Sequence, residues 1–377
     1  MEVRGGGRRR RRVVSVVGTR PEAIKMAPLV RALNRSARIE QRLILTRQHS
    51  GLSDCFDLPD EQVSELPFDP RGRSTVRLRE MLHHLLCGEF RLAPIDLLLV
   101  HGDTASAMAA ALAARGCGIP IGHVEAGLRS FDMKQPSPEE GYRVAIDAMA
   151  EILFAPSQSA AENLRRDWRA KGEILVTGNT GIDALLDACG RIGDVDADAT
   201  DRKLILVTCH RRENQGDPIR AVCAAMKRLV EELPVRIAAP LHPNRHARAA
   251  MEEELRDLDH IQLLDPLNYQ PMVRLLLRSW LILTDSGGLQ EEGPALGKPV
   301  LVLRNVTERP EALATGNIQL VGTNPDEILR SVAELLHDKD RYSCMSRPAF
   351  PFGDGRASIR IVSAIEAWLA RRDLRAA

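Results

Sequence analysis

Aromatic residues, unbalanced charge and long apolar runs are scarce in this chain, and each scarcity excludes a class of protein. Phenylalanine, tryptophan and tyrosine make up only 3% of the 377 residues, too few to provide stacking platforms for single-stranded nucleic acid. The 52 basic and 51 acidic residues leave a net charge of +1, so no general field attracts polyanions. The longest apolar runs have the length of a strand, far below the roughly 20 residues of a membrane span. We therefore expect neither a nucleic-acid nor a membrane partner.

Cofactor and metal motifs are missing as well. The seven cysteines are scattered, without the close pairs of a zinc site or a redox motif, which favours a reduced, cytoplasmic protein. The glycine fingerprint of a dinucleotide fold does not occur, and neither does a His-Glu-x-x-His or clustered-aspartate signature. We predict that the protein uses no cofactor and no metal.

Short aliphatic runs alternate with helical segments along the whole chain. Runs that are apolar on both faces are typical of parallel strands covered by helices on each side. A chain of this length also exceeds the roughly 250–300 residues that one core supports, so we predict two doubly wound, Rossmann-like α/β domains. The expected strands are Val13–Val17, Leu43–Thr46, Leu97–Val100, Ile152–Phe154 and Ile174–Thr177, then Leu204–Thr208, Val235–Ala239, Ile261–Leu264, Leu281–Thr284, Val300–Leu303 and Ile318–Val321.

The domain limits follow from the polar segments. Residues 1–12 are basic and lack the apolar segment of a signal peptide, so we predict a disordered extension there. The polar stretch from Gly190 to Arg202 indicates the domain junction, and we place the N-terminal domain at 13–181 and a nucleotide-binding C-terminal domain at 182–356. The last helix, from about residue 357, could pack on either domain.

The segment from Ile282 to Glu292 is the most informative in the chain. It reads as a buried strand, a small-residue turn and the start of a helix. Backbone N–H groups at Ser286, Gly287 and Gly288 can form a seat for a phosphate, and the Glu292 carboxylate can reach the ribose of the same nucleotide. A nucleotide-linked substrate is the prediction.

Polar residues follow several other predicted strands, and ligands of open α/β sheets bind at such strand ends. We expect these groups to converge on a cleft between the two domains. Arg20, in the first loop, and Lys25, one turn into the following helix, can hold a diphosphate; a helix-end salt bridge is the alternative. His210 with Arg212 brings an imidazole and positive charge to a phosphate leaving group, whereas a helix cap is the simpler role.

Four acidic residues are the candidates for proton transfer. In a partly dry cleft their mutual repulsion would raise at least one pKa, which would give one base and one acid. The simpler roles are a helix cap for Asp103, a salt bridge from Glu125 to Arg129, and a solvated face for Glu139 and Glu140. His242 and Asn244 can line the same cleft, and we expect His101 and His123 to orient other groups or to pack.

Taken together, these strings resemble the non-hydrolysing UDP-N-acetylglucosamine 2-epimerases, from Val13 to Gly355. The matching segments are Gly18-Thr-Arg-Pro-Glu-Ala-Ile-Lys-Met-Ala-Pro-Leu29, His101-Gly-Asp-Thr104, Gly122-His-Val-Glu-Ala-Gly-Leu-Arg129, Thr177-Gly-Asn-Thr180, His210-Arg-Arg-Glu213, Asp285-Ser-Gly-Gly-Leu-Gln-Glu-Glu292 and Thr307-Glu-Arg-Pro-Glu311. The resemblance implies a glycosyltransferase-B type fold whose last helix, at about 357–377, returns to the first domain. It also implies a homodimer acting in surface polysaccharide synthesis.

The activity that the resemblance implies is the interconversion of UDP-N-acetylglucosamine and UDP-N-acetylmannosamine, through elimination of UDP to a 2-acetamidoglucal and its re-addition. By resemblance, Asp103, Glu125, Glu139 and His210 are catalytic, and Arg20, Ser286, Gly287, Gly288 and Glu292 contact the nucleotide. We expect Lys25, Arg143, Arg212, His242 and Asn244 to contact the substrate as well. Gln48 and Arg73 partly reproduce a second, allosteric substrate site of bacterial members.

Two departures from the family pattern leave alternatives open. Tyr142 stands where the family usually has asparagine, and Cys209 where it commonly has glycine. Either larger side chain could reshape the sugar pocket, so a related UDP-acetamido sugar is one alternative. A UDP-sugar-binding glycosyltransferase-like protein, a hydrolysing 2-epimerase and a catalytically silent UDP-sugar sensor are the others.

Overall fold

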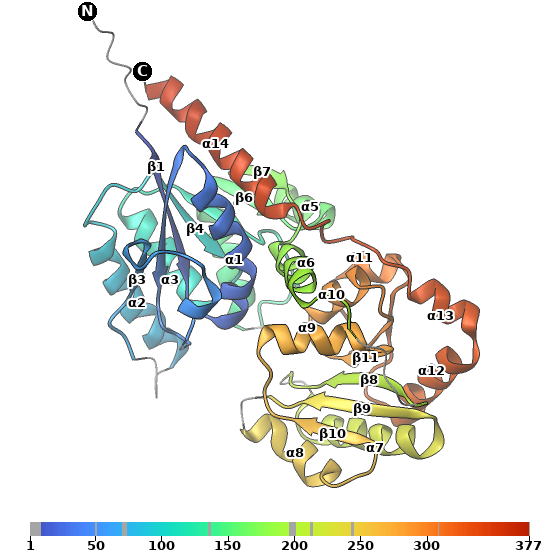
Figure 1. Ribbon diagram of the computed structural model, residues 1–377. Helices are drawn as coiled ribbons and strands as arrows, with labels where there is room; N and C mark the ends of the chain where they lie inside the picture. Colours follow the sequence, from blue (N-terminus) through green and yellow to red (C-terminus); the bar gives the residue numbers. More distant parts are fainter. Residues whose placement is uncertain are drawn as a thin grey trace, which may run out of the picture. The chain divides into compact units, whose positions relative to one another are not determined.

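The protein contains two compact units, each built around one parallel β-sheet (Figure 1). The computed structural model describes residues 9–49, 51–69, 74–134, 137–195, 201–211, 214–242, 245–307 and 309–376. Unit 1 runs to Ala184 and resumes at Phe352, and unit 2 comprises Leu185–Pro351. The structure divides the chain after Ala184, inside helix α6 (Thr180–Ile192), three residues beyond the boundary between 181 and 182 that the sequence suggested.

Unit 1 has a seven-stranded sheet with the order β3-β2-β1-β4-β5-β6-β7, in which every neighbouring pair is parallel. Its strands are β1 (Arg11–Val17), β2 (Ile39–Leu45), β3 (Val63–Glu65), β4 (Leu97–His101), β5 (Ile121–Val124), β6 (Ile152–Ala155) and β7 (Glu173–Val176). The α-helices are α1 (Arg20–Arg35), α2 (Thr75–Glu89), α3 (Ala105–Gly116), α4 (Glu139–Met149), α5 (Gln158–Arg166), α6 (Thr180–Ile192) and α14 (Ala357–Ala376), with short 3₁₀ turns at Ser53–Cys55 and Asp60–Gln62.

Successive side chains of a strand point to opposite faces of the sheet, and in unit 1 both faces are covered by apolar residues of helices. In β1, Val14 and Val16 belong to one core cluster together with leucines of α2 and alanines of α3. Val13 and Val17 point to the other face, where they join apolar residues of α1 and α14. Helices therefore cover both faces of the sheet, as a parallel sheet requires.

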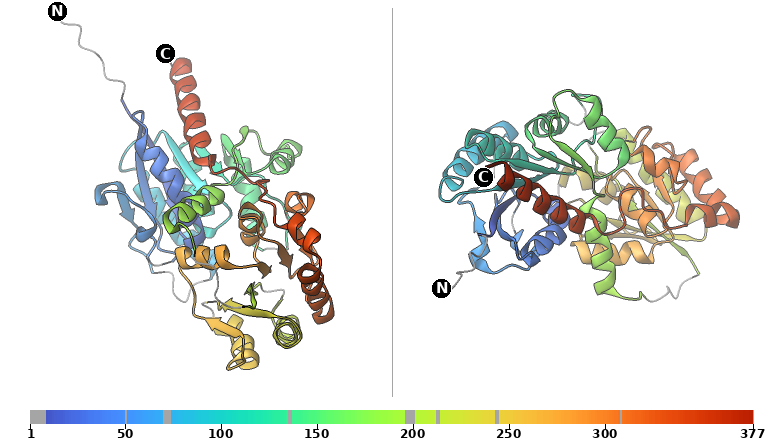
Figure 2. Two further views of the ribbon diagram at one scale, coloured as in Figure 1. Left: turned by 45° about the vertical axis from the view of Figure 1, so that its right-hand side comes forward. Right: turned by 90° about the horizontal axis from the view of Figure 1, so that it is seen from above.

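The last helix belongs to unit 1, where α14 packs along α1 (Figures 1 and 2). Asp183 in α6 fixes its start, because its carboxylate accepts hydrogen bonds from the N–H groups of Ala357 (3.1 Å) and Ser358 (2.7 Å). A carboxylate at that position also complements the positive end of the helix dipole.

Unit 2 has a six-stranded parallel sheet with the order β10-β9-β8-β11-β12-β13. Its strands are β8 (Lys203–Thr208), β9 (Val235–Pro240), β10 (Ile261–Leu264), β11 (Leu281–Thr284), β12 (Val300–Val302) and β13 (Ile318–Leu320). The helices are α7 (Asp217–Glu232), α8 (Arg245–Leu255), α9 (Tyr269–Arg278), α10 (Leu289–Ala295), α11 (Pro310–Ala314), α12 (Pro325–His337) and α13 (Lys339–Met345).

The predicted α/β class, with two doubly wound parallel sheets, is confirmed. Two strands lie outside the predicted series: β3, at the edge of the first sheet, and β5, between β4 and β6. The first strand begins at Arg11, so residues 11 and 12 of the predicted extension lie in the sheet, and residues 1–8 lie outside the described part of the chain. Every helix in the described ranges is too short or too polar to cross a bilayer.

Candidate functional site

The candidate proton-transfer residues of unit 1 lie at one edge of its sheet. Strands β4 and β5 are neighbours in register, with His101 opposite Val124. Asp103 comes two residues after the end of β4, and Glu125 directly follows β5. Because parallel strands end on the same side, the sheet brings both carboxylates to its carboxyl-terminal edge.

Glu125 is surrounded by nitrogen donors. The Lys25 ammonium forms an ion pair with Oε1, and Asn179 Nδ2 donates to the same oxygen at 2.9 Å. His101 Nε2 lies 3.8 Å from Oε2, and this buried nitrogen has no hydrogen-bond partner. Burial lowers the pKa of His101 to about 4, so at neutral pH its ring is uncharged. Lys25 thus contacts a candidate catalytic carboxylate, besides its predicted contact with diphosphate.

Asp103 is paired with Arg143 from α4. The Arg143 guanidinium also donates to Glu140 Oε2 at 2.7 Å, and Glu140 in turn accepts hydrogen bonds from the N–H groups of Ser130 and Phe131. Glu140 is 1% exposed, so the solvated face considered for it is wrong, while Glu139 is half-buried as the first residue of α4. The Arg143 guanidinium thus bridges the carboxylates of Asp103 and Glu140. The unscreened repulsion between carboxylates that the sequence suggested does not describe this pair.

Glu22 was not among the predicted site residues, yet it connects two of the site's loops. One carboxylate oxygen accepts the N–H groups of Gly18 (3.1 Å) and Thr19 (2.6 Å), which completes a capping box at the start of α1. The other accepts the hydroxyl of Thr104 (2.6 Å), the residue next to Asp103. Complete burial raises the pKa of Glu22 to about 7. The capping box is visible in the sequence, but the contact with Thr104 is not.

A second buried network supports the same loops. His123 donates from Nε2 to the carbonyl oxygen of Gly102 at 2.8 Å, and its Nδ1 lies 2.6 Å from Asp147 Oδ1. Asp147 Oδ2 accepts from Arg129 Nη1 at 2.6 Å. Arg129 therefore pairs with Asp147 and Asp167, and the salt bridge to Glu125 considered from the sequence is wrong. His123 holds the backbone beside Asp103, in keeping with its expected orienting role.

In unit 2 the corresponding edge of the sheet carries His210 and the small-residue turn. Strands β8 and β11 are neighbours with Thr208 opposite Thr284, so the loops that follow them start side by side. His210 follows β8, and its ring stacks on that of His242 with 5.3 Å between centroids. Asp285, which was not predicted as a site residue, is fully buried and accepts the backbone N–H groups of His210 and Arg211 at 2.8 Å each.

The residues predicted to bind phosphate are Ser286, Gly287 and Gly288, and the structure shows which groups surround them. The N–H of Ser286 donates to the Thr284 hydroxyl at 2.9 Å, so one of the three predicted backbone donors already has a partner within the turn. A Cβ at Gly287 would lie 2.6 Å from Arg309 Nη1, so the guanidinium of Arg309 packs directly against this glycine. Gly288 precedes α10. Sequence reasoning missed Arg309, although it belongs to one of the quoted motifs.

The remaining predicted residues occupy varied positions. Glu292 in α10 accepts a hydrogen bond from the Tyr269 hydroxyl at 3.3 Å, and burial raises the pKa of that tyrosine. Arg20 is exposed, and its N–H donates to His49 Nδ1 at 3.2 Å, while Gln48 accepts from the Ser106 hydroxyl at 2.8 Å. The other three predicted residues lie outside the described residues: Arg73, Arg212 and Asn244. In the part of the chain that the structure describes, no group of three or more His, Cys, Asp or Glu side chains is arranged to hold a metal ion.

The two departures from the family pattern are buried. Tyr142 is 7% exposed and belongs to a core cluster of unit 1, and Cys209 is 5% exposed and belongs to the core cluster of unit 2. A side chain packed among apolar residues has little surface to offer a sugar. Their burial gives no support to a reshaped sugar pocket.

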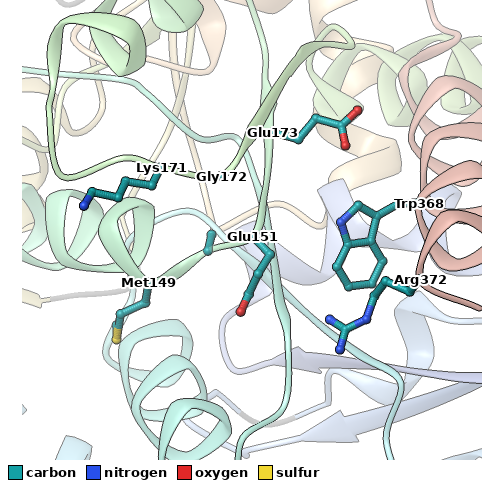
Figure 3. Close-up of a pocket in the computed structure, with 8 residues that line it drawn as sticks. Met149, Glu151, Lys171, Gly172, Glu173, Trp368 and Arg372 are labelled. Carbon is teal, nitrogen blue, oxygen red and sulfur yellow. The ribbon is translucent and has the colours of Figure 1, made fainter. Parts of the chain in front are cut away.

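A separate cavity of about 650 Å³ lies in unit 1, next to the starts of β6 and β7 (Figure 3). Arg372 lies 4.8 Å over the ring of Trp368 at its edge, and Glu151, Lys171 and Glu173 line it as well. None of the predicted site residues within the described ranges contributes to its lining. This cavity is at the strand ends opposite to those of the candidate catalytic residues.

Comparison with known proteins agrees with the motifs. The family model described as UDP-N-acetylglucosamine 2-epimerase matches residues 31–366. The UDP-N-acetylglucosamine 2-epimerase of Yersinia pestis is 42% identical over 373 residues, covering 94% of this chain and 98% of that protein. The crystal structure of UDP-GlcNAc 2-epimerase from Neisseria meningitidis bound to UDP-GlcNAc has a TM-score of 0.87, 34% identity, and coverage of 94% and 100%.

A more distant structure, that of the glycotransferase of kitacinnamycin, has a TM-score of 0.61 at 14% identity, over 96% of this chain and 100% of that one. At this level of identity the likeness concerns the fold alone. The match of the family model over most of the chain, together with relatives above 40% identity, is specific to one family. The chain belongs to the UDP-N-acetylglucosamine 2-epimerase family.

Proposed function

We propose that the protein catalyses the reversible conversion of UDP-N-acetylglucosamine into UDP-N-acetylmannosamine. The observation that carries the proposal is the similarity of nearly the whole chain to enzymes named for this activity, with 42% identity to the Yersinia pestis protein. The loops that hold Asp103, Glu125 and His210 are ordered by buried hydrogen bonds, as expected of a site that must be preorganised.

The proposed reaction has two halves. In the first, the C2 proton passes to a protein base while the C1–O bond breaks, which releases UDP and leaves a 2-acetamidoglucal. In the second, a protein acid protonates C2 on the opposite face while a phosphate oxygen of UDP attacks C1. The protons and the leaving group balance, and the protein needs only acids, bases and donors to the diphosphate.

Roles follow from the charges around each group. Asp103, Glu125 and Glu139 are the proposed proton carriers, and the ion pairs with Arg143 and Lys25 hold the carboxylates of Asp103 and Glu125 in place between steps. We assign the departing diphosphate to His210, Ser286, Gly287 and Gly288 of unit 2, with Arg309 as an additional donor. We assign Glu292 as the acceptor for the ribose hydroxyls. Arg20 and Lys25 keep their proposed contacts with the substrate.

Two amide substitutions test the assignment of the carboxylates. Asp103→Asn and Glu125→Gln should lower kcat by about 10²–10⁴-fold, the usual contribution of general acid–base catalysis, with UDP affinity nearly unchanged. Turnover is measured by chromatography of the two UDP-sugars and affinity by calorimetry, with exposed Glu162→Gln as the matched control. Wild-type turnover in both variants would remove these residues from the mechanism.

We also propose that the protein works as a homodimer in the cytoplasm. The dimer rests on the family resemblance, and the location on seven cysteines that all carry free thiols. Light scattering on the eluting protein tests the first point: a mass near twice 41.7 kDa supports a dimer, and a mass near 41.7 kDa contradicts it.

A further inference from the structure

The two carboxylate oxygens of Asp285 have very different surroundings. Asp285 is fully buried directly after β11, and its Oδ2 accepts three hydrogen bonds: from the N–H groups of His210 and Arg211, and from Asn214 Nδ2 at 2.9 Å. Its Oδ1 has no hydrogen-bond partner. A buried carboxylate oxygen without a partner is rare in folded proteins and calls for an explanation.

The His210 ring and the Cys209 thiol are both recorded as neighbours of the Asp285 carboxyl, and the measured contact of Oδ1 is with His210. Nδ1 of His210 lies 3.6 Å from Asp285 Oδ1, so a movement of the ring of about 0.7 Å would bring the pair to hydrogen-bond distance. The ring is already confined, because it stacks on His242 on one side and its own backbone is held by the same carboxylate. Among the residues that the structure describes, Arg211, next in the chain, also acts on the charge of His210.

We propose that Asp285 is a positioning residue for His210: its Oδ1 accepts the Nδ1 proton of the imidazole, which leaves Nε2 directed to the diphosphate of the substrate. The inference rests on the proposed function, because it assigns a partner to a residue proposed to act on the leaving group. Asp285 itself does not contact the substrate. It acts by fixing which ring nitrogen carries the proton and by stabilising the imidazolium form.

The electrostatic environment agrees with this role. Burial lowers the pKa of His210, and the Asp285 carboxylate acts in the opposite direction. An imidazolium donates from both nitrogens, so it could bind the departing diphosphate through Nε2 and Asp285 through Nδ1 at once. Without the carboxylate, burial would leave the ring neutral and its tautomer undefined.

The substitution Asp285→Asn tests whether Asp285 orients the His210 ring or only stabilises the loop that carries it. The amide oxygen has to occupy the Oδ2 position, because three donors point there, so the amide NH₂ takes the Oδ1 position and faces His210 Nδ1. The loop keeps its hydrogen bonds, while the preferred proton position on His210 is reversed. We expect kcat to fall by at least 10²-fold with a nearly unchanged Kd for UDP, and the high-pH decline of kcat to move to lower pH.

The decisive readout is the ¹⁵N spectrum of His210 in the full-length protein, assigned with a His210→Gln variant and recorded with and without UDP. We expect a protonated Nδ1 in the wild type and a bare Nδ1 in Asp285→Asn. A bare Nδ1 in the wild type, or the same proton position in both proteins, would overturn the inference. The wild-type spectrum decides even where the variant does not fold.

Asn214→Ala is the matched control, since it removes another hydrogen bond to Asp285 Oδ2 without changing what faces His210. If Asp285 only stabilised the loop, Asp285→Asn, which keeps all three hydrogen bonds at the Oδ2 position, would change kcat and the pH profile no more than Asn214→Ala does. The two proposals also fail separately: absence of epimerase activity in the wild type would refute the proposed function, while the proton position on His210 still tests its partner.

Discussion

Replacing Glu22 by glutamine should change the way in which the stability of the protein depends on pH. Glu22 is completely buried and contacts the N–H groups of Gly18 and Thr19 on one side and the Thr104 hydroxyl on the other. A glutamine can keep all of these contacts, with its amide oxygen toward the two N–H groups and its NH₂ toward Thr104. The substitution therefore removes a titration and little else.

The magnitude follows from the raised pKa. Burial raises the pKa of Glu22 from an ordinary value of 4.5 to about 7, a difference of about 2.5, and at 1.36 kcal/mol for each pKa unit this corresponds to roughly 3 kcal/mol. Because the folded state holds the proton more tightly, its advantage is complete below pH 4.5 and is lost as the pH rises to about 7. Relative to wild type, Glu22→Gln should gain roughly 3 kcal/mol of unfolding free energy across this window.

The assay is urea unfolding of both proteins at half-unit intervals between pH 4.5 and pH 8.5, followed by circular dichroism. Taking the difference between the two proteins cancels the titrations that they share. Exposed Glu80→Gln in α2 controls for the loss of one carboxylate. A difference between Glu22→Gln and wild type that stays constant with pH would refute the account of Glu22 as a buried acid.

Three further substitutions test other parts of the structure. Gly287→Ala places a Cβ 2.6 Å from Arg309 Nη1 and should weaken UDP binding by about tenfold in calorimetry; an unchanged Kd would contradict the role given to Arg309. Asp147→Asn removes the closer of the two carboxylates that pair with buried Arg129 and leaves it only Asp167 at 3.5 Å, so it should cost about 3 kcal/mol in urea unfolding, and a near-neutral effect would contradict that network. Tyr142→Asn creates a cavity in the core and should cost about 3 kcal/mol. It should not improve turnover of UDP-N-acetylglucosamine, and a gain would mean that Tyr142 does shape the sugar pocket.

The sequence predicted most strands because they are apolar on both faces. Positions just after those strands indicated candidates such as Asp103 and His210, and the family resemblance supplied the catalytic roles. The strands that it missed lack a continuous aliphatic run: β3 is Val-Ser-Glu, and β5 is Ile-Gly-His-Val, with a glycine and a histidine at its centre. Such segments acquire their structure from neighbouring strands rather than from their own composition.

The hydrogen-bond and ion-pair partners of the site residues could not be predicted from the sequence, because they are far away along the chain. Lys25 and Glu125 are 100 positions apart, Glu22 and Thr104 are 82 apart, and Asp285 and the N–H of His210 are 75 apart. Such pairs depend on the order and register of the strands, which no local pattern encodes. Residue types and loop positions therefore identified candidates, whereas the charge around each candidate required the fold.

The most direct test of the proposed activity is to incubate the protein with UDP-N-acetylglucosamine in D₂O and to follow the sugar signals by proton NMR. We predict the appearance of UDP-N-acetylmannosamine with deuterium at C2 in both UDP-sugars, without added cofactor, because each turnover breaks the C2–H bond and forms it again with a proton from solvent. An unchanged spectrum under conditions where calorimetry shows binding, or the release of free N-acetylmannosamine and UDP, would contradict reversible epimerisation by this protein.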